Sequence, residues 1–578
     1  MNYLQNYNPM GNFWLSVVIA ALPILALLYF LAIHPHTSKT GKHLLGIYPP
    51  YAAAIAVFVA FLIAVFVMKM PATTAGASFG LGVISGLFPI GWIVFGAIFL
   101  YTMTVVTGKF EIVKDSIAGL TPDRRLQALL VAFAFGAFIE GAAGFGTPVA
   151  VAGGIMVGLG FRPLTAAVIC LIANTAPVAW GSIGTPVLTL AKITGIPDGL
   201  ITQMAGRQLP LFSIIIPFWL VATLVLMERG HWKQVWEVWP AILVTGASFA
   251  TAQFLMAEAH MTMLVDIVAG MVSIIVTSLF LKVWTPKNII TNEMAYAVMD
   301  GREPGKARVV PKHSWPVLLQ AWTPWVFLAI FVGLWGVPGI KTFLNGFFDP
   351  SFQVPHLDGV VFRTAPVSPT AVAKAGEAAV YTFNLITMAG TGMLLAAFIT
   401  GIFVLKVTVA QWKEILVGTI LRVKMPLSVI ALVLGLGYMT RYAGTDAVLG
   451  LAFAKTASFY PFFAAMIGWL GVFLTGSDTA SNSLFGSLQQ ITANQLGLNP
   501  LLIVTANSTG GVMGKMIDAQ SITVATAACY YADPEEGVNS IGAIFRKVLP
   551  HSVVLAILMG ILVWLQAYVF TWMIPAMK

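Results

Sequence analysis

The stretch GAFIEGAAGFGTP at residues 136–148 places a carboxylate, Glu140, among glycines inside a long apolar segment. A second stretch of this kind, GVFLTGSDTASNS at residues 471–483, carries Asp478 in the other half of the chain. A charged group and a broken helix are tolerated within a bilayer only where they face protein or a water-filled cavity. The two stretches therefore indicate a membrane protein with a buried polar site to which each half contributes.

The composition also places the chain in a membrane. Hydrophobic residues make up 58% of the 578 residues and charged residues 9%, and the mean hydropathy is +0.88, which a water-soluble globular protein does not reach. Apolar runs of about 20 residues, long enough to cross a bilayer as a helix, recur along the chain. We predict an all-α polytopic fold with a single membrane domain over residues 1–578.

We expect about twelve transmembrane helices. The predicted crossings are residues 12–33, 47–68, 78–107, 163–195, 209–228, 236–256, 261–282, 316–336, 381–406, 424–443, 500–530 and 548–573. The formal net charge of +9 comes from Lys and Arg that cluster in short loops between alternate crossings, and cytoplasmic loops attract such residues. This pattern predicts that both termini are periplasmic, and it explains the basic charge without a nucleic-acid partner.

Two segments, residues 126–160 and 459–496, have the wrong length for one crossing, and Gly, Pro, Ser or Thr divides each near its middle. We interpret both as re-entrant hairpins. The crossings that follow, residues 163–195 and 500–530, contain helix breakers and are expected to be broken helices. Each half of the chain therefore carries a hairpin followed by a broken helix.

This order of elements occurs twice, over residues 78–230 and 415–578. The basic loops place the two copies in opposite orientations, which is the inverted-repeat plan of many secondary transporters. Residues 231–414 are expected to form connecting helices, with loops at 283–315 and 338–380 to which the sequence assigns no role.

The matched breaks predict a transport site between the hairpin tips and the broken helices. Half-helix starts within a membrane offer unpaired amides to an anion, and Thr147 with Pro148 and Thr185 with Pro186 have the residue types of a helix start. Hydroxyl and amide side chains at the breaks can bind a small carboxylate. The candidate substrate-binding residues are Gly144, Thr147, Asn174, Thr185, Thr475, Ser477, Thr479, Ser481, Asn482, Asn507, Ser508 and Lys515.

Glu140 and Asp478 are the candidate proton-coupling residues, because removal from water favours the protonated form of a carboxylate. The sequence contains neither a metal-ligand cluster nor a phosphate-binding loop, so we expect no metal and no cofactor, with protons as the coupling ion. Other roles stay open. Glycines also serve close helix packing, Glu140 could be structural, Lys515 and Asp518 could pair on one helix face, and Arg441 could attract an anion or extend to lipid headgroups.

Long parts of the sequence resemble the bacterial L-lactate permeases. They include TPDRRLQ at 121–127, FGAFIEGAAGFGTPVA at 135–150, NTAPVAWGSIGTP at 174–186 and GWLGVFLTGSDTASNSLF at 468–485. The resemblance implies a transporter, not an enzyme, that imports L-lactate, D-lactate and glycolate with protons across the bacterial inner membrane. It also implies alternating access in a fold similar to the ion-transporter superfamily, and it allows an oligomeric assembly.

The sequence leaves alternative functions open, among them a channel or membrane-embedded sensor for the same anion. Clustered Ser, Thr and Asn side chains at helix breaks can also coordinate Na⁺, so the chain could be a sodium-coupled transporter of another small carboxylate. The proton-coupled and sodium-coupled alternatives differ in the ion gradient that would drive uptake.

Overall fold

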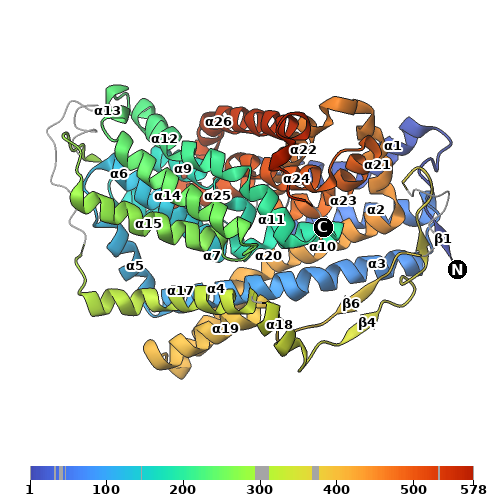
Figure 1. Cartoon of the computed structure of the whole chain (residues 1–578), viewed down its shortest axis with the longest axis horizontal. Coiled ribbons are helices and arrows are strands. Elements are labelled where there is room, and N and C mark those ends of the chain that lie inside the picture. Colours follow the sequence, from blue (N-terminus) through green and yellow to red (C-terminus); the bar gives the residue numbers. More distant parts are fainter. Residues whose placement is uncertain are drawn as a thin grey trace.

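The structure is a computed structural model that describes residues 2–30, 34–37, 43–45, 47, 49–144, 146–292, 311–336, 338–367, 376–530 and 534–576. It is a bundle of long helices, most of which run along the long axis of the molecule (Figure 1). Helix α13 lies at one end of the bundle, and the N-terminus lies at the other with strands β1, β4 and β6. The all-helical membrane fold predicted from composition is confirmed.

The helices of the first half are α1 (Phe13–Leu28), α2 (Pro49–Leu62), α3 (Ala72–Ser85), α4 (Trp92–Val106), α5 (Lys109–Ala118), α6 (Arg124–Gln127), α7 (Gly136–Ala143), α8 (Thr147–Gly158), α9 (Pro163–Ala173), α10 (Gly181–Thr194), α11 (Asp198–Gly206), α12 (Leu209–Met227), α13 (Lys233–Trp236), α14 (Trp239–Glu258) and α15 (Val265–Val283). Those of the second half are α17 (Trp315–Gly336), α18 (Pro338–Asn345), α19 (Ala389–Ile399), α20 (Val409–Ala443), α21 (Thr445–Phe453), α22 (Tyr460–Thr475), α23 (Asp478–Leu496), α24 (Pro500–Gly514), α25 (Ala519–Cys529) and α26 (Pro534–Tyr568).

Short π and 3₁₀ segments join or extend these helices. The π segments are η2 (Ile63–Val67), η3 (Gly86–Gly91), η4 (Ala128–Phe135) and η6 (Thr400–Val404), and the 3₁₀ segments are η5 (Val178–Trp180), η7 (Ala454–Phe459), η8 (Lys515–Ile517) and η9 (Thr571–Met573). The described strands pair in twos: β1 (Tyr3–Leu4) with β5 (Val361–Phe362) in parallel, and β2 (Pro35–Thr37) with β3 (His43–Leu45) and β4 (Ser351–Gln353) with β6 (Val380–Thr382) antiparallel.

Within the described residues, ten helical segments are long and apolar enough to cross a membrane, or eleven with the α9–α10 pair, which is bent by 69°. Eight of the ten coincide with predicted crossings. The other two, Arg124–Ala143 and Thr445–Phe473, overlap the predicted hairpins, while the predicted crossings 12–33 and 381–406 contain shorter apolar helices. The total of twelve crossings therefore stays a prediction.

Each segment predicted as a hairpin consists of two helices joined at glycines. Helix α7 ends at Gly144, Gly146 precedes α8, and both glycines have positive φ, +59° and +80°. Helix α22 ends at Gly476, with φ +72°. Helix α8 then packs against η4, and α23 packs against α22. The positions of the breaks agree with the prediction, and a re-entrant path through a membrane stays a prediction.

Several local predictions are wrong. Gly146 is the N-cap of α8, so Thr147 is the first helical residue and does not cap the helix. The basic segment before residue 424 is helical, because Thr408 and Gln411 form a capping box that starts α20 at Val409. The loop predicted at 338–380 contains α18 and strands β4 to β6, and residues 293–310 of the other predicted loop lie outside the described residues.

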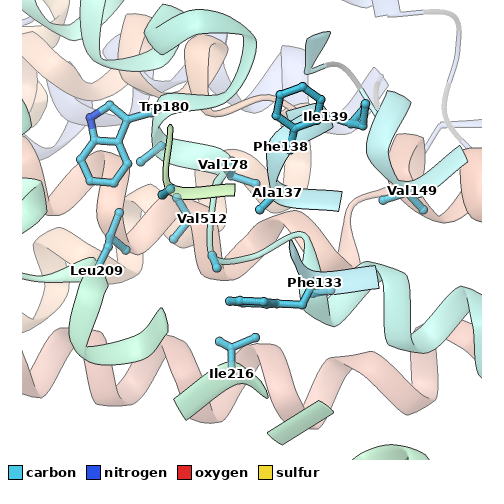
Figure 2. Close-up of a cluster of buried hydrophobic side chains, with 14 of the residues drawn as sticks. Phe133, Ala137, Phe138, Ile139, Val149, Val178, Trp180, Leu209, Ile216 and Val512 are labelled. Atoms are coloured by element: carbon cyan, nitrogen blue, oxygen red, sulfur yellow. The ribbon is translucent and has the colours of Figure 1, made fainter. Parts of the chain in front are cut away.

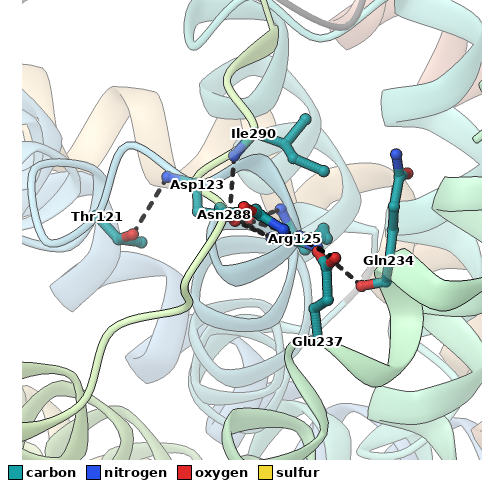
Figure 3. A network of polar contacts seen from close by, with 7 residues as sticks. All are labelled: Thr121, Asp123, Arg125, Gln234, Glu237, Asn288 and Ile290. Carbon is teal, nitrogen blue, oxygen red and sulfur yellow. Dashed lines mark hydrogen bonds and ion pairs between the residues drawn. The ribbon is translucent and has the colours of Figure 1, made fainter.

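A buried arginine anchors the foot of the first hairpin (Figure 3). Arg125, whose side chain is 1% exposed, donates two hydrogen bonds to Asp123 and one to Glu237. It also donates to the backbone carbonyls of Gln234 and Asn288. A buried guanidinium is stable only when its donors are satisfied in this way, so the network fixes the start of α6 relative to α13 and the segment after α15.

Large apolar side chains fill the space around the two helix breaks (Figure 2). Phe133 and Phe138 precede the break at Gly144, and Val178 and Trp180 lie in the break between α9 and α10. Val512 comes from α24. All five are almost fully buried. Polar groups at the breaks therefore lie in a region of low dielectric constant, where their charges act strongly on one another.

Candidate functional site

The breaks of the two halves enclose a cavity of about 40 Å³, which we name the carboxylate cavity. Its wall consists of Glu140, Gly144, Val178, Gly181, Ser182, Thr185, Pro186, Gly476, Ser477, Asp478, Thr479, Lys515 and Gln520. The structure thus brings together seven of the residues predicted for the site, from two segments that are far apart in the sequence. These seven are Glu140, Gly144, Thr185, Ser477, Asp478, Thr479 and Lys515.

Glycines allow Glu140 to lie directly on the broken helix of its own half. A side chain at Gly181 would meet the Glu140 carboxylate, and a Cβ at Gly144 would lie 2.7 Å from that of Ser182. Glu140 is 3% exposed, and its Oε2 atom has no hydrogen-bond partner among the described residues. One oxygen of this carboxylate is therefore available to a proton or a bound molecule.

Asp478 begins the helix that follows the second break. The hydroxyl of Ser477, the N-cap residue, accepts a hydrogen bond of 3.3 Å from the Ala480 amide. Asp478 Oδ2 accepts hydrogen bonds from the Ser508 hydroxyl at 2.5 Å and from Asn482 at 3.4 Å. Its Oδ1 has no partner within the described part of the chain, so Asp478 has one oxygen held by hydrogen bonds and one without a partner.

An amide network holds Asp478 from behind. Asn507 donates to Asn482 Oδ1 at 2.9 Å and accepts from Gln489 at 3.1 Å, and Asn482 also donates to the Pro186 carbonyl at 3.2 Å. Asn482, Asn507 and Ser508, predicted as substrate ligands, are absent from the cavity wall. Asn482 and Ser508 are partners of Asp478, and Asn507 holds Asn482. They fix the orientation of the carboxylate and connect the two broken helices.

Lys515 is the basic residue on the cavity wall. Its Nζ donates to the Gly476 carbonyl at 2.7 Å and lies 3.3 Å from Asp518 Oδ2, so the ion pair that the sequence allowed does form. Asp518 caps α25 by accepting hydrogen bonds from the Ser521 amide and hydroxyl, at 2.7 and 2.6 Å. Lys515 also lies near enough to Glu140 and Asp478 to act on their charges.

The remaining predicted residues lie outside the cavity wall. Thr475 and Ser481 donate to the carbonyls of Gly471 and Gly468 within their own hairpin. Asn174 is buried at the end of α9 and lies beside the Glu140 carboxylate, within reach of a side-chain hydrogen bond to it. The helix start predicted at Thr185 does border the cavity, but Thr185 donates to the Gly181 carbonyl and does not cap the helix.

The sequence analysis missed a further buried carboxylate, Asp266, in the first turn of α15. It is 1% exposed, and one oxygen accepts from Gln253 at 3.4 Å. A Cβ at Gly141 would lie 2.9 Å from Asp266 Cβ, so this residue packs beside the helical turn that carries Glu140. An available signal was that Asp266 is the only acidic residue between positions 258 and 293.

The charges of the cavity determine what it can bind. Asp518, which is outside the wall, pairs with Lys515 and offsets its charge, so the site including Asp518 carries two formal negative charges when Glu140 and Asp478 are ionised and none when both are protonated. The starts of α23 and α25 lie at the wall, and helix starts attract anions. The cavity can therefore accept an anion once its carboxylates are protonated.

A polytopic helical bundle with a small charged cavity between helix breaks is the architecture of a membrane transporter. The sequence matches the L-lactate permease family over residues 16–570, and the chain belongs to that family. As a permease it is a transporter and not an enzyme.

Two relatives match along their whole length. The chain is 42% identical to the glycolate permease GlcA of Escherichia coli, over 99% of this chain and 100% of that protein. It is 41% identical to the L-lactate permease of Bacillus subtilis, over 100% of both chains. Among solved structures, the Alcanivorax borkumensis YdaH transporter covers 98% of the chain at 14% identity with a TM-score of 0.42, a similarity too low to define a shared fold.

Proposed function

We propose that the protein imports L-lactate, together with D-lactate and glycolate, by proton symport across the bacterial inner membrane. Membership of the L-lactate permease family supports this substrate class, and the relatives named above are a glycolate permease and an L-lactate permease. Lactate and glycolate share one carboxylate and one neighbouring hydroxyl. The cavity offers one ammonium group, Lys515, and the hydroxyls of Ser477 and Thr479, which suits a small hydroxy acid.

Proton coupling rests on a single observation, namely that Glu140 and Asp478 both face the cavity that would hold the anion. Two like charges about 6 Å apart repel by about 3 kcal/mol at an effective dielectric constant of about 20. Protonating one wall carboxylate would therefore raise the affinity for lactate by roughly 100-fold. Substrate and proton then bind together. Loss of the proton lowers the affinity for the substrate, and loss of the substrate lowers the affinity for the proton.

The size of the cavity supports an alternating-access mechanism. Its volume of about 40 Å³ is well below the roughly 300 Å³ at which ligand pockets usually begin. Lactate can occupy the site only if part of the wall moves outward. The backbone can change direction at least cost at the glycines of the helix breaks, which are Gly144, Gly181 and Gly476.

The two halves are proposed to be inverted repeats. A long helix, two helices joined at a glycine break, and a broken helix follow one another both in α4 to α10 and in α20 to α25. With both termini periplasmic, such repeats would bring the two hairpin tips together from opposite sides of the membrane. The movement that opens the cavity to one side of the membrane would then resemble the movement that opens it to the other side.

The direct test is uptake of labelled L-lactate into proteoliposomes that contain the purified protein. We expect an inward pH gradient alone to drive accumulation, and a sodium gradient at equal pH to have no effect. A strict sodium requirement would replace proton symport by the sodium-coupled alternative. Lactate that equilibrates without accumulating under either gradient would refute secondary active transport.

A further inference from the structure

A second polar pocket, of about 380 Å³, lies at the far end of two helices that line the carboxylate cavity. We name it the arginine pocket, after the side chains of Arg363, Glu377, Arg441 and Gln490 in its wall. Helix α23 begins with Asp478 in the cavity and reaches Gln490 in the pocket, about 18 Å further on at 1.5 Å per residue. Helix α10 likewise borders both spaces.

The seam between α10 and α23 connects the two sites. Gly486 has no side chain at the point where Leu190 packs against it, since a Cβ there would lie 2.8 Å from Leu190. Gln490 donates to the Thr194 carbonyl at 2.9 Å at the pocket end of the seam. Asn482, which holds Asp478, donates to Pro186 at the cavity end. A change at one site can therefore reach the other along one pair of packed helices.

The pocket holds two guanidinium groups around one carboxylate. Arg363 donates to Glu377 Oε1, and Arg441 Nη2 lies 3.5 Å from Glu377 Oε2. Arg441 also donates to the Ile193 carbonyl at 2.6 Å, so it does not extend to lipid headgroups. Its Nε atom has no hydrogen-bond partner among the described residues. Donors that suit a carboxylate thus remain beside the single acid of the pocket wall.

Solvent can reach these charges. The side chains of Arg363, Glu377 and Arg441 are 26%, 16% and 23% exposed. Two positive charges against one negative charge in the wall favour an anion, and Asp446, which acts on both arginines, is buried and absent from the wall. The N-terminal segment packs alongside, because Gln5 donates to the Arg441 and Tyr442 carbonyls. The pocket therefore lies at the end of the bundle predicted to be periplasmic.

We propose that the arginine pocket is a first binding site for the transported monocarboxylate, occupied before the anion reaches the carboxylate cavity. The substrate carboxylate takes the place of Glu377 between the two guanidinium groups. This assignment rests on the proposed function, and it gives a role to the segment around Arg363 and Glu377, to which the sequence assigned none.

The test is the concentration dependence of labelled L-lactate influx into vesicles with the N-terminal side outward. We expect Arg441→Gln to raise KM about tenfold with little change in the maximal rate, as for loss of a charged hydrogen bond. Glu377→Gln removes the competing carboxylate and should lower KM about threefold. Glu258→Gln is the matched control, because Glu258 pairs with Arg207 at similar exposure away from both sites, and it should leave KM unchanged.

Opposite changes of KM in the two pocket variants would support the proposal. If these residues only attach the loop to the bundle, Glu377→Gln would leave KM unchanged or raise it, and either result would overturn the proposal. Should Arg441→Gln fail to insert, Glu377→Gln alone decides. Failure of the wild-type protein to accumulate lactate would instead refute the proposed function, so the two failures are distinguishable.

Discussion

Replacing Glu140 by glutamine should separate lactate transport from proton uptake. Glutamine has almost the shape of a protonated glutamate, and Glu140 Oε2 has no hydrogen-bond partner among the described residues. The substitution therefore removes a charge while it breaks no bond to that atom. At an effective dielectric constant of about 20, a charge about 6 Å from the substrate carboxylate costs about 3 kcal/mol, so the variant should bind lactate like the wild type protonated at Glu140.

This reasoning predicts opposite results in two assays. In the wild type, KM should rise about tenfold per pH unit once Glu140 ionises, whereas in Glu140→Gln it should stay flat over the same range. Exchange of labelled external for unlabelled internal lactate should persist in the variant, because it requires no net proton movement. Accumulation driven by a pH gradient should be lost.

Two controls make the measurement decisive. Asp198 accepts a hydrogen bond from the Thr262 hydroxyl, as Asp478 does from a serine hydroxyl, but it lies outside the cavity wall. Asp198→Asn should therefore leave coupling intact. Asp478→Asn compares the other cavity carboxylate. If Glu140→Gln accumulates lactate as well as the wild type at equal protein levels, Glu140 does not carry the coupled proton and the reasoning is refuted.

Three further variants test other parts of the structure. Gly144→Ala should insert normally but lose most uptake, because the residue has a positive φ and its new Cβ would clash with Ser182. Gly195→Ala is the control in the same uptake assay, because Gly195 also has a positive φ but lies in open space. Ser508→Ala should slow uptake about tenfold by freeing an oxygen of Asp478, a loss of about 1–3 kcal/mol, measured as the maximal rate at equal expression. Arg125→Ala should destabilise the protein by about 3–5 kcal/mol, seen as a lower Tm in detergent, and an unchanged Tm would contradict the role of its network.

The positions of the helix breaks could be predicted from the sequence. Gly144 and Gly476 stand in apolar runs where a helix would otherwise continue, and a carboxylate lies within four residues of each. Such residues are too costly in a membrane to have no partner, so their meeting in one cavity was a reasonable inference. The composition and the long apolar runs likewise predicted an all-helical membrane fold.

The arrangement around the carboxylates could not be predicted in the same way. Asn482 lies one helical turn after Asp478 in α23. The direction in which this helix begins therefore decides whether Asn482 faces the cavity or holds Asp478. The left-handed turn at Ser182 and Ile183 uses residues that rarely adopt positive φ, and only packing in the folded protein holds it. Asp266 comes from a helix outside both motifs, and its contact with the turn around Glu140 depends on tertiary packing.

The division of the site between the two halves gives its carboxylates different roles. Lys515 donates to the carbonyl of Gly476, two residues before Asp478, so the lysine and Asp478 belong to one half and move together. Glu140 comes from the other half and lines the same cavity. If transport moves one half against the other, the separation between Glu140 and Lys515 changes, whereas that between Asp478 and Lys515 does not. A lysine that recedes no longer stabilises the ionised form of Glu140, so this carboxylate is the one whose proton affinity would differ between the two states, and a proton carrier must have that property.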